Sequence, residues 1–466
     1  MNEFEAVLAE VLRRVTPSPE ERERVGAVVE NVVEGLRKAV AELALRAEVE
    51  VEGSYAKDTW LSGDVDVDVF LLFDTGVSLE ELRAGGLAAA RMAAQLVGAR
   101  CVERFASHPY LTLLLDACSI DVVPAYRVPS PLQIRSPVDR TPFHTSYVKR
   151  RLDEKPELRK DVRILKRFAK GTGVYGAEVK VEGFSGYLLE LLVIHYGSFP
   201  DFIRSAARWK PYKVIIDIEG HYPNKRSILE RFKDPLVVID PVDPDRNVAS
   251  PVSLESLSRF IAAARAFLRK PSIHFFYPVT PEPRQLETLL EGRAVAAVKL
   301  RVPTLPEDIL WGQVKRALRA LQSGLERFGF PVIGASAWAE GGEVVLLFEL
   351  ETLELPPLER HEGPPVYSDH DERFISAYAA GRCVAGPYIE GDRWVVIRPR
   401  KVRNAREALT KLLSTYNIGE HLTECAKSGF QILTGGEVVK ASTLDSYRAH
   451  LYGWLTRKEP WMLEAD

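Results

Sequence analysis

Cysteine, methionine and long apolar runs are scarce in this sequence. Of 466 residues, four are cysteine and three are methionine. The cysteines, at positions 101, 118, 383 and 425, lack the paired spacing of a zinc site or a redox motif, so we expect reduced, mostly buried thiols. No apolar run reaches the roughly 18 residues that a membrane helix needs. The first residues carry acids where a secretion signal would carry bases. These absences predict a cytoplasmic protein without a membrane partner.

An excess of basic charge is also missing. Lys and Arg total 62 against 65 for Asp and Glu, which gives a net charge of −3. The whole chain is therefore not a strongly basic nucleic-acid-binding protein. Local basic segments at 149–151, 204–213 and 398–403 are either solvated surface or contacts to an RNA backbone. The hydrophobic content of 46% and charged content of 27% are typical of globular chains and exclude a disordered one.

Hydrophobic periodicity and proline divide the chain into three predicted domains, 1–150, 151–275 and 276–466. Prolines between 129 and 142 break regular structure before the first boundary, and Pro271 marks the second. The first domain alternates helices with strands and the second is helical. The third pairs a helix with strands joined by a Gly341-Gly342 turn, which resembles an RNA-recognition (ferredoxin-like) sandwich. We therefore expect a multi-domain α+β fold.

The same periodicities set the bounds of individual elements. The predicted helices are 21–43, 79–96, 161–170, 187–196, 254–267 and 306–327. The predicted strands are 48–52, 65–73, 100–105, 110–116, 119–126, 294–300, 332–338 and 343–350.

One predicted strand carries an acidic face. Asp66 and Asp68 are two residues apart, which places both carboxylates on one side of the strand, roughly 6 to 7 Å apart at the backbone. Carboxylates this close repel one another unless cations lie between them, and Mg²⁺ is the hard cation that carboxylates and phosphates share. Asp121 on a neighbouring strand would complete a two-metal site. The alternative is a solvated strand face or a charged sheet edge.

A Gly-Ser pair precedes this strand. Gly53 would let the backbone approach a phosphate, and Ser54 offers a hydroxyl and an N–H to it. An isolated Gly-Ser pair is more often an ordinary turn, so only its combination with the acidic strand favours a phosphate site.

Together these residues resemble a known family. Gly53-Ser54, eleven residues and then Asp66-Val67-Asp68-Val69 are similar to the nucleotidyltransferase signature of the DNA polymerase β-like superfamily. The stretches 53–61 and 120–124 resemble those of archaeal (class I) CCA-adding enzymes, and so do 141–145, 174–178, 183–187 and 240–249, in the same order. The resemblance covers about residues 20–270 and is looser beyond 300.

The resemblance implies a fold and an activity. It implies a palm-like mixed sheet, a helical central domain and a C-terminal body and tail. It also implies template-independent addition of C, C and A to the 3′ end of tRNA from CTP and ATP, with Mg²⁺ as cofactor and pyrophosphate as product. The family is commonly dimeric, so a homodimer is expected. We further expect residues 276–466 to grip the tRNA.

The resemblance also assigns residues. Asp66 and Asp68 match the metal-binding pair and Asp121 matches the third carboxylate, and these three are the catalytic and metal candidates. The matching nucleotide-binding positions are Gly53, Ser54, Lys57, His144, Lys166, Tyr175 and Arg246. The family commonly has Glu at 66 and Arg at 57, and Lys57 gives up the bidentate fork to phosphate. Asp64 with Asp66 is an alternative metal pair.

Each remaining candidate also has a structural interpretation. His144, as a lone histidine, would be a satisfied structural residue. Lys166 lies on a basic helical stripe that would be a solvated surface face. Tyr175, flanked by glycines, would anchor a loop, and Arg246 would cap a helix or form an ion pair. The competing functions are a poly(A)-polymerase or oligoadenylate-synthetase-like enzyme, and a non-catalytic RNA-binding relative.

Overall fold

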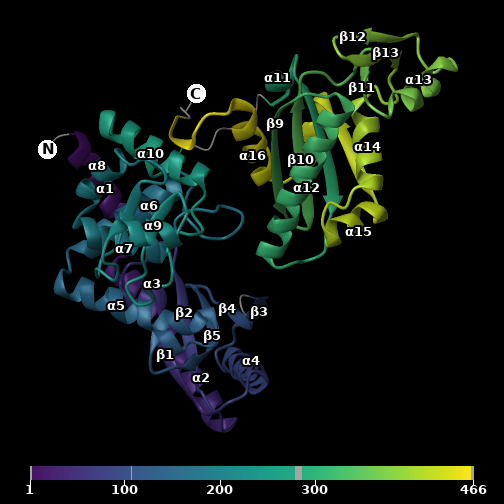
Figure 1. Cartoon of the computed structure of the whole chain (residues 1–466). Helices are drawn as coiled ribbons and strands as arrows, with labels where there is room; N and C mark the ends of the chain where they lie inside the picture. Colours follow the sequence, from purple (N-terminus) through teal and green to yellow (C-terminus); the bar gives the residue numbers. More distant parts are fainter. Residues whose placement is uncertain (1–2, 106–107, 279–285, 463–466) are drawn as a thin grey trace. The chain divides into compact units, whose positions relative to one another are not determined.

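The N-terminal sheet contains the acidic strand at its second position. In the computed structural model, which describes residues 3–105, 108–278 and 286–462, five strands form a sheet ordered β1-β2-β5-β4-β3 (Figure 1). β2 and β5 run parallel, and the other neighbouring pairs run antiparallel. The strands are β1 (Ala47–Glu52), β2 (Asp66–Asp74), β3 (Arg100–Phe105), β4 (Pro109–Leu114) and β5 (Ser119–Arg127). The five strands predicted for residues 48–126 are thereby confirmed, with shifts of up to two residues at their ends.

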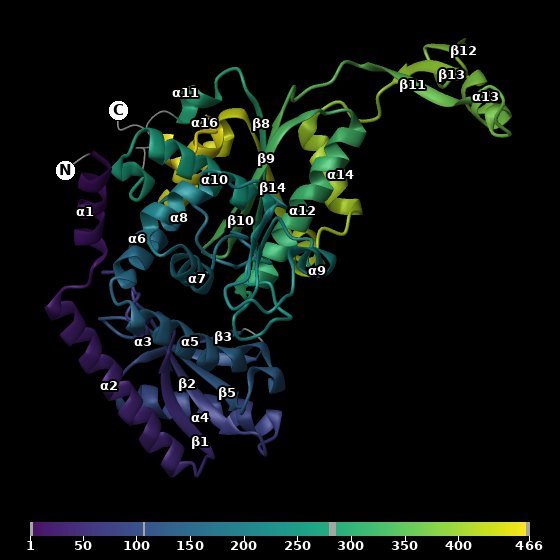
Figure 2. The same ribbon diagram turned by 60° about the vertical axis from the view of Figure 1, so that its left-hand side comes forward.

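The two faces of this sheet differ in chemistry. Helices α2 (Pro19–Glu42) and α4 (Leu79–Leu96) lie against one face of the sheet (Figure 2). On that face, Val67, Val69 and Leu71 of β2 are buried among the apolar side chains of the two helices. Because side chains alternate along a strand, Asp66 and Asp68 are presented on the other face. The sheet packing therefore fixes the direction in which the acidic residues project.

A mainly helical layer packs beside the sheet, and most of it follows the sheet in sequence. Its helices pack around buried rings that include Phe168, Phe199 and Phe260. Pro142 lies in the first turn of α5, where a missing N–H costs no hydrogen bond, so α5 begins within the proline-rich segment and continues past residue 150. The elements are α1 (Glu3–Val15), α3 (Gly53–Ala56), α5 (Thr141–Glu154), α6 (Leu158–Gly171), α7 (Gly186–Tyr196), α8 (Phe199–Ala206), β6 (Val214–Ile216), α9 (Lys225–Arg231), β7 (Leu236–Val238) and α10 (Leu254–Arg269).

The described chain forms two compact units. Residues 3–278 and 459–462 belong to one, and residues 286–458 belong to the other. Residues 459–462, at the C-terminal end of the described chain, are held in the first unit by two contacts. Trp461 stacks on Phe275 with ring centroids 5.8 Å apart, and Glu459 accepts from Arg259 at 2.8 Å. Within the described ranges, no helix is long and apolar enough to span a membrane.

The second unit is built on an antiparallel four-stranded sheet. Its order, β14-β8-β10-β9, is that of the ferredoxin-like βαββαβ unit, with residues 358–399 inserted before the second helical part. Gly341 and Gly342 form the β9–β10 turn with φ of 61° and 77°, as a type I′ hairpin requires. The predicted α+β sandwich is confirmed. Its elements are β8 (Ala294–Arg301), α12 (Glu307–Phe328), β9 (Val332–Glu340), β10 (Glu343–Leu350), α14 (Ala405–Thr415), α15 (Glu420–Ser428) and β14 (Phe430–Thr434).

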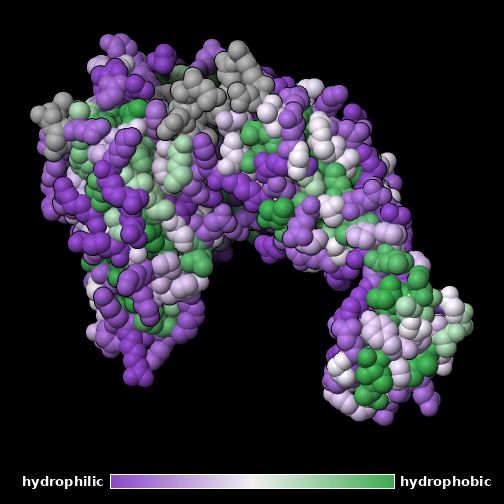
Figure 3. Space-filling view, turned by 90° about the horizontal axis from the view of Figure 1, so that it is seen from above, coloured by the Kyte–Doolittle hydropathy of each residue, from purple (hydrophilic) through white to green (hydrophobic). Residues whose placement is uncertain are grey.

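Further elements complete this unit. Helices α11 (Leu286–Leu290) and α16 (Asp445–Thr456) pack on the β8 and β10 side chains that include Val295 and Val345. A small separate sheet and the turns beside its strands carry exposed large side chains, among them Tyr367, Val384 and Ile389. Figure 3 shows patches of hydrophobic residues on the largely hydrophilic surface of the chain. The small sheet consists of β11 (Leu358–Pro365), β12 (Ala385–Glu390) and β13 (Arg393–Pro399) with helix α13 (Asp371–Ala379).

All four cysteines are free thiols, as the sequence predicts. The expectation that most of them are buried is wrong. Cys118 is buried, Cys101 is exposed on β3, and Cys383 and Cys425 are partly exposed. Short apolar runs around a cysteine do not reveal which face of its strand or helix is covered.

Candidate active site

The three predicted carboxylates meet on adjacent strands. Asp68 of β2 lies directly opposite Asp121 of β5 in the parallel ladder, and Asp66 is two residues before Asp68 on the same face. The Ser119 hydroxyl donates to Asp66 Oδ1 at 2.5 Å, and the Thr112 hydroxyl of β4 donates to Asp121 Oδ1 at 2.6 Å. Hydroxyl donors from neighbouring strands therefore orient two of the three carboxylates.

Negative charge accumulates around these residues. Burial raises the pKa of Asp68 to about 6, and the neighbouring Asp121 raises it further, while Lys57 opposes both effects. Burial also raises the pKa of Asp121. Glu52 lies opposite Asp68 in the β1–β2 ladder, and burial raises its pKa to about 7. One of its buried carboxylate oxygens has no hydrogen-bond partner. Asp68, Asp121 and Glu52 therefore have too few positively charged neighbours to balance their negative charges.

Carboxylate oxygens whose negative charge is not balanced by the protein are suitable ligands for a hard divalent cation. In the described ranges, no three His, Cys, Asp or Glu side chains are arranged to hold a metal ion by themselves. The fit is therefore to a cation that takes some of its ligands from a phosphate-bearing substrate or from water, as Mg²⁺ commonly does.

The alternative metal pair has a different environment. Asp64 precedes β2, and its Oδ2 accepts from Lys170 Nζ. A carboxylate already paired with a lysine is a weaker candidate for a metal ligand than one paired with another carboxylate. The geometry favours Asp66 with Asp68.

Gly53 lies against the acidic strand. It opens the short helix α3 directly after β1 and has φ of 69°, in the left-handed region. A β-carbon at this position would lie 1.8 Å from Asp68 Oδ2, so only glycine leaves room for that carboxylate. The Gly53 N–H donates to the Thr145 hydroxyl at 3.3 Å, which ties the turn to α5.

Two lysines share one buried acid beside the carboxylates. Lys57 Nζ donates to Glu190 Oε2 at 2.6 Å, and Lys166 Nζ donates to Glu190 Oε1 at 2.8 Å. Thr59 donates its hydroxyl to Glu190 Oε1 at 2.6 Å and accepts from Lys166 at 3.0 Å. Glu190 is fully buried, and both lysines are nearly so. The interpretation of Lys166 as part of a solvated stripe is therefore wrong.

A charged cleft of about 280 Å³ joins these groups. It brings together seven of the ten predicted site residues, and Asp121 lies one strand away from it. The described lining residues are Gly53, Ser54, Lys57, Thr59, Trp60, Leu61, Asp64, Asp66, Asp68, Lys166, Lys170, Tyr175, Gly186, Tyr187 and Glu190.

His144 and Arg246 form a second cluster around Asp240. His144 Nε2 lies 2.9 Å and Arg246 Nη1 2.8 Å from Asp240 Oδ2, and the Tyr187 hydroxyl donates to Asp240 Oδ1 at 3.0 Å. Burial would raise the pKa of Asp240, but the bonds from His144 and Arg246 outweigh it and lower the pKa to about 2. Burial lowers the pKa of His144. Tyr187 stacks on His144 with ring centroids 4.0 Å apart and also lines the charged cleft, so it links the two clusters.

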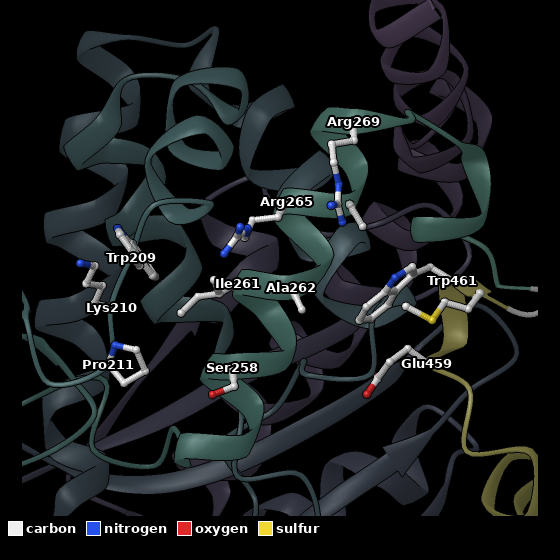
Figure 4. A pocket seen from close by; sticks show the side chains of 12 residues that line it. Trp209, Lys210, Pro211, Ser258, Ile261, Ala262, Arg265, Arg269, Glu459 and Trp461 are labelled. Carbon is white, nitrogen blue, oxygen red and sulfur yellow. The ribbon is translucent and has the colours of Figure 1, made fainter.

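A larger hollow of about 470 Å³ lies elsewhere in the same unit. Figure 4 shows Arg265 and Arg269 projecting from α10 beside Ile261 and Trp461. Its lining is mainly apolar and includes none of the predicted site residues. We therefore place the chemistry in the charged cleft, although it is the smaller of the two.

Sequence reasoning missed Glu190, Asp240, Thr59 and Tyr187 as site residues. Glu190 carried a usable signal, because a single acid in an otherwise apolar helix is rarely buried without a cationic partner. Asp240, Thr59 and Tyr187 lie inside stretches that resemble the family, but nothing in their spacing points to His144 or Lys166.

Comparison with known proteins matches the chain in three consecutive segments. The models described as nucleotidyltransferase domain, tRNA nucleotidyltransferase second domain and CCA-adding enzyme C-terminal domain match residues 33–144, 160–277 and 291–435. A solved structure of a cytoplasmic RNA terminal U-transferase superposes with a TM-score of 0.45 at 16% identity, covering 59% of this chain and 97% of that one.

Curated relatives match nearly the whole chain. The CCA-adding enzyme of Haloarcula marismortui is 37% identical over 479 residues, covering 98% of this chain and 99% of that protein. The CCA-adding enzyme of Pyrobaculum islandicum is 39% identical over 433 residues, covering 91% and 98%. With this identity over almost its full length, and with Asp66, Asp68 and the two lysines lining one cleft, the chain belongs to the CCA-adding enzyme family.

Proposed function

We propose that this protein adds C, C and A to the 3′ end of tRNA from CTP and ATP, without a nucleic-acid template and with release of pyrophosphate. The observation that carries the proposal is the pairing of Asp68 with Asp121 beside a cleft that also holds Lys57 and Lys166. Carboxylates suit a cation bound to a triphosphate, and ammonium groups suit the triphosphate itself.

Asp66, Asp68 and Asp121 are the proposed metal and catalytic residues, with Mg²⁺ as the proposed ion. A bound divalent cation supplies positive charge beside the attacking 3′-hydroxyl and the leaving pyrophosphate. Asp66, Asp68 and Asp121 would hold two such cations, and Asp121 would also accept the proton of the hydroxyl. The raised pKa of Asp121 suits it to that role, because a base works best when its pKa approaches the working pH. The 3′-oxygen attacks the α-phosphorus, whose bond to the β-phosphate oxygen breaks.

The proposed nucleotide contacts fall into two groups. Ser54, Lys57, Lys166 and Tyr175 line the cleft with Gly53 and are placed to bind the triphosphate. His144 and Arg246 are proposed to face the base or sugar, held in position by Asp240. Their donors are side chains with fixed partners, which is what recognition of a base edge needs.

The division into 1–150, 151–275 and 276–466 stays a prediction, supported by the order of the three family matches. The third domain is proposed to grip the tRNA, and a homodimer in the cytoplasm is proposed by resemblance to the family.

Truncation near residue 275 is a poor test of the tRNA grip. It would also remove Glu459 and Trp461, which pack on Arg259 and Phe275 of the first unit. Substitutions of surface cations between 286 and 458 leave that anchor intact. They are expected to raise the KM for tRNA without changing the KM for CTP.

The decisive experiment offers the purified protein a tRNA that ends at the discriminator base, together with all four nucleoside triphosphates. Addition of C, C and A alone supports the proposal. A long A homopolymer, or products formed from nucleotides alone, would identify a poly(A)-polymerase or oligoadenylate-synthetase-like enzyme. Binding of tRNA without cation-dependent turnover would identify a non-catalytic relative.

The raised carboxyl pKa values predict a pH-dependent effect of divalent cations on stability. Asp68 has an ordinary pKa of 3.8 and about 6 in the folded protein, so its contribution to stability is lost as pH rises between these values. Glu52 behaves in the same way between 4.5 and about 7. Millimolar Mg²⁺ should raise Tm by about 2–5 °C near pH 7.5 and by much less near pH 5.

Thermal melts at matched ionic strength measure this effect. A monovalent salt is the control for general screening, and Asp68→Asn should remove most of the gain. An equal gain at both pH values would contradict the assignment of the cation to these carboxylates.

A further inference from the structure

Glu190 is the least expected charge in the cleft. It projects from α7, whose other buried side chains are leucine and valine, and it is fully buried. Both of its oxygens are used, since Oε2 accepts from Lys57 while Oε1 accepts from Lys166 and Thr59. A carboxylate in this position costs desolvation energy, so its retention needs a reason beyond packing.

The two lysines differ in what they have left to donate. Lys166 Nζ already has three protein acceptors, which are Glu190 Oε1, the Thr59 hydroxyl and, at 3.3 Å, the Thr59 carbonyl. Lys57 Nζ has Glu190 as its one hydrogen-bond partner within the described chain, so two of its protons are free. An ammonium group with free protons at the wall of a cleft is the one that can donate to a phosphate directly.

The cluster also has a defined charge. Two ammonium groups and one carboxylate leave one net positive charge, held by groups from the α3 loop, α6 and α7. Without Glu190, the two buried cations would lose the one carboxylate to which both donate hydrogen bonds. We expect Lys166 then to lose its proton, because burial already lowers its pKa and Glu190 is the main group that raises it.

We propose that Glu190 is a positioning residue that holds Lys57 and Lys166 in place to receive the triphosphate of the incoming nucleotide. Lys57 donates to the phosphates directly. Lys166 donates its hydrogen bonds to Glu190 and Thr59, which fixes the positions of both residues. It adds positive charge to the site without donating to the phosphates itself. This inference rests on the proposed function for the identity of the ligand, and it adds a residue that does not itself touch the nucleotide.

Glu190→Gln tests the proposal, because glutamine keeps the size of the side chain and removes its charge. Binding of inorganic triphosphate with Mg²⁺ is measured by calorimetry on the full chain without tRNA. The dissociation constant should rise about tenfold or more, as expected when a charged hydrogen-bond acceptor is lost. The KM for CTP and for ATP should rise in parallel while the KM for tRNA stays unchanged. Unchanged or tighter triphosphate binding overturns the proposal.

A pH series separates positioning from mere packing. The groups that face Lys166 are Glu190, Lys57 and Arg163, with Asp68 close by, and only Glu190 is altered. The ratio of variant to wild-type triphosphate affinity should recover as pH is lowered from about 9 to about 6, because Lys166 regains its proton. A ratio that is constant with pH assigns Glu190 a packing role and overturns the proposal.

Controls keep the test decisive. Asp161→Asn removes another buried carboxylate, one on α6 that accepts from the Phe199 N–H at 3.0 Å outside the cleft, and should leave triphosphate binding unchanged. Glu190→Asp keeps the charge and should recover part of the affinity. If Glu190→Gln does not fold, the Glu190→Gln/Lys166→Gln double variant removes the unpaired charge. The double variant should fold and bind triphosphate weakly, and wild-type affinity in it overturns the proposal.

The inference and the proposed function can fail separately. If wild-type protein binds triphosphate in a Glu190-dependent way but adds no C or A to trimmed tRNA, the proposed function fails alone. If wild-type protein completes the tRNA end and Glu190→Gln binds triphosphate normally, the inference fails alone.

Discussion

Asp68→Asn should abolish nucleotide transfer, lowering kcat for CMP addition by about a hundred- to a thousandfold or more. The carboxylate lies opposite Asp121 in the parallel ladder, and it is the less exposed member of the proposed metal pair. Asparagine keeps the shape of the side chain but removes the charge that would hold the cation. Single-turnover incorporation of labelled CMP into trimmed tRNA measures the loss.

The same substitution should stabilise the protein in the absence of divalent cations. The raised pKa of Asp68 indicates that folding disfavours the charged form of this carboxyl group. Removing the charge should raise the free energy of unfolding by about 1–3 kcal/mol, since each pKa unit is worth about 1.4 kcal/mol. Lower activity together with higher stability distinguishes a functional carboxylate from a structural one.

Asp74→Asn is the matched control. Asp74 is on the same face of β2, six residues from Asp68, but it is exposed at the far end of the strand. Its substitution should change neither kcat nor stability appreciably. Normal CMP and AMP addition by Asp68→Asn would show that the metal site has been placed wrongly.

Gly53→Ala should lower kcat/KM for CTP by about a hundredfold, because misplacing reacting groups by about 1 Å has an effect of that size. The added β-carbon would overlap Asp68 Oδ2, so either the carboxylate or the turn that carries Ser54 must move. Steady-state kinetics with trimmed tRNA measure the change.

Gly98→Ala separates the clash from backbone strain. Gly98 has φ of 68°, nearly that of Gly53, but a β-carbon there meets nothing within 4 Å. Both variants should lose about 1 kcal/mol of stability through the left-handed backbone. Only Gly53→Ala should lose activity. Equal kinetic losses would mean that strain, and not the contact with Asp68, explains the effect.

The acidic strand could be predicted closely from its own residues. Alternation of aspartate with valine requires a strand with one apolar and one charged face, and β2 begins within one residue of the predicted start. Helix α4 coincides with its prediction, since a capping box at Ser78 and a regular apolar stripe define both ends locally. The βαββ start of the second unit also agrees with its prediction, whereas α14, α15 and β14 were not predicted.

The pairing of Asp68 with Asp121 needed the fold. It depends on β2 and β5 being adjacent and parallel although β3 and β4 lie between them in sequence, and on a register that no local pattern specifies. Helix α5 was not predicted at all, for a related reason. Proline is tolerated in a first helical turn, and prolines further upstream hid the turn in which the helix starts.

The basic stripe of residues 161–170 shows the limit of local patterns most clearly. Arg163 and Lys166 are spaced as on a solvated helix face, yet both are buried, and their partners Asp58 and Glu190 come from other elements. A cationic side chain can be buried only where the element that packs against its helix offers a hydrogen-bond acceptor. Helical spacing carries no information about that element.

By itself, the sequence determined the type and approximate extent of the five strands of the N-terminal sheet and of the long helices, the acidic face of one strand and the family to which the motifs belong. These follow from interactions within a few residues, such as side-chain alternation, capping and turn geometry. Tertiary structure alone decided that Glu190 binds Lys57, 133 positions away, and that Asp240 joins His144 to Arg246. Pairing of buried charges depends on which surfaces meet, and contacts across such separations arise only when the chain has folded.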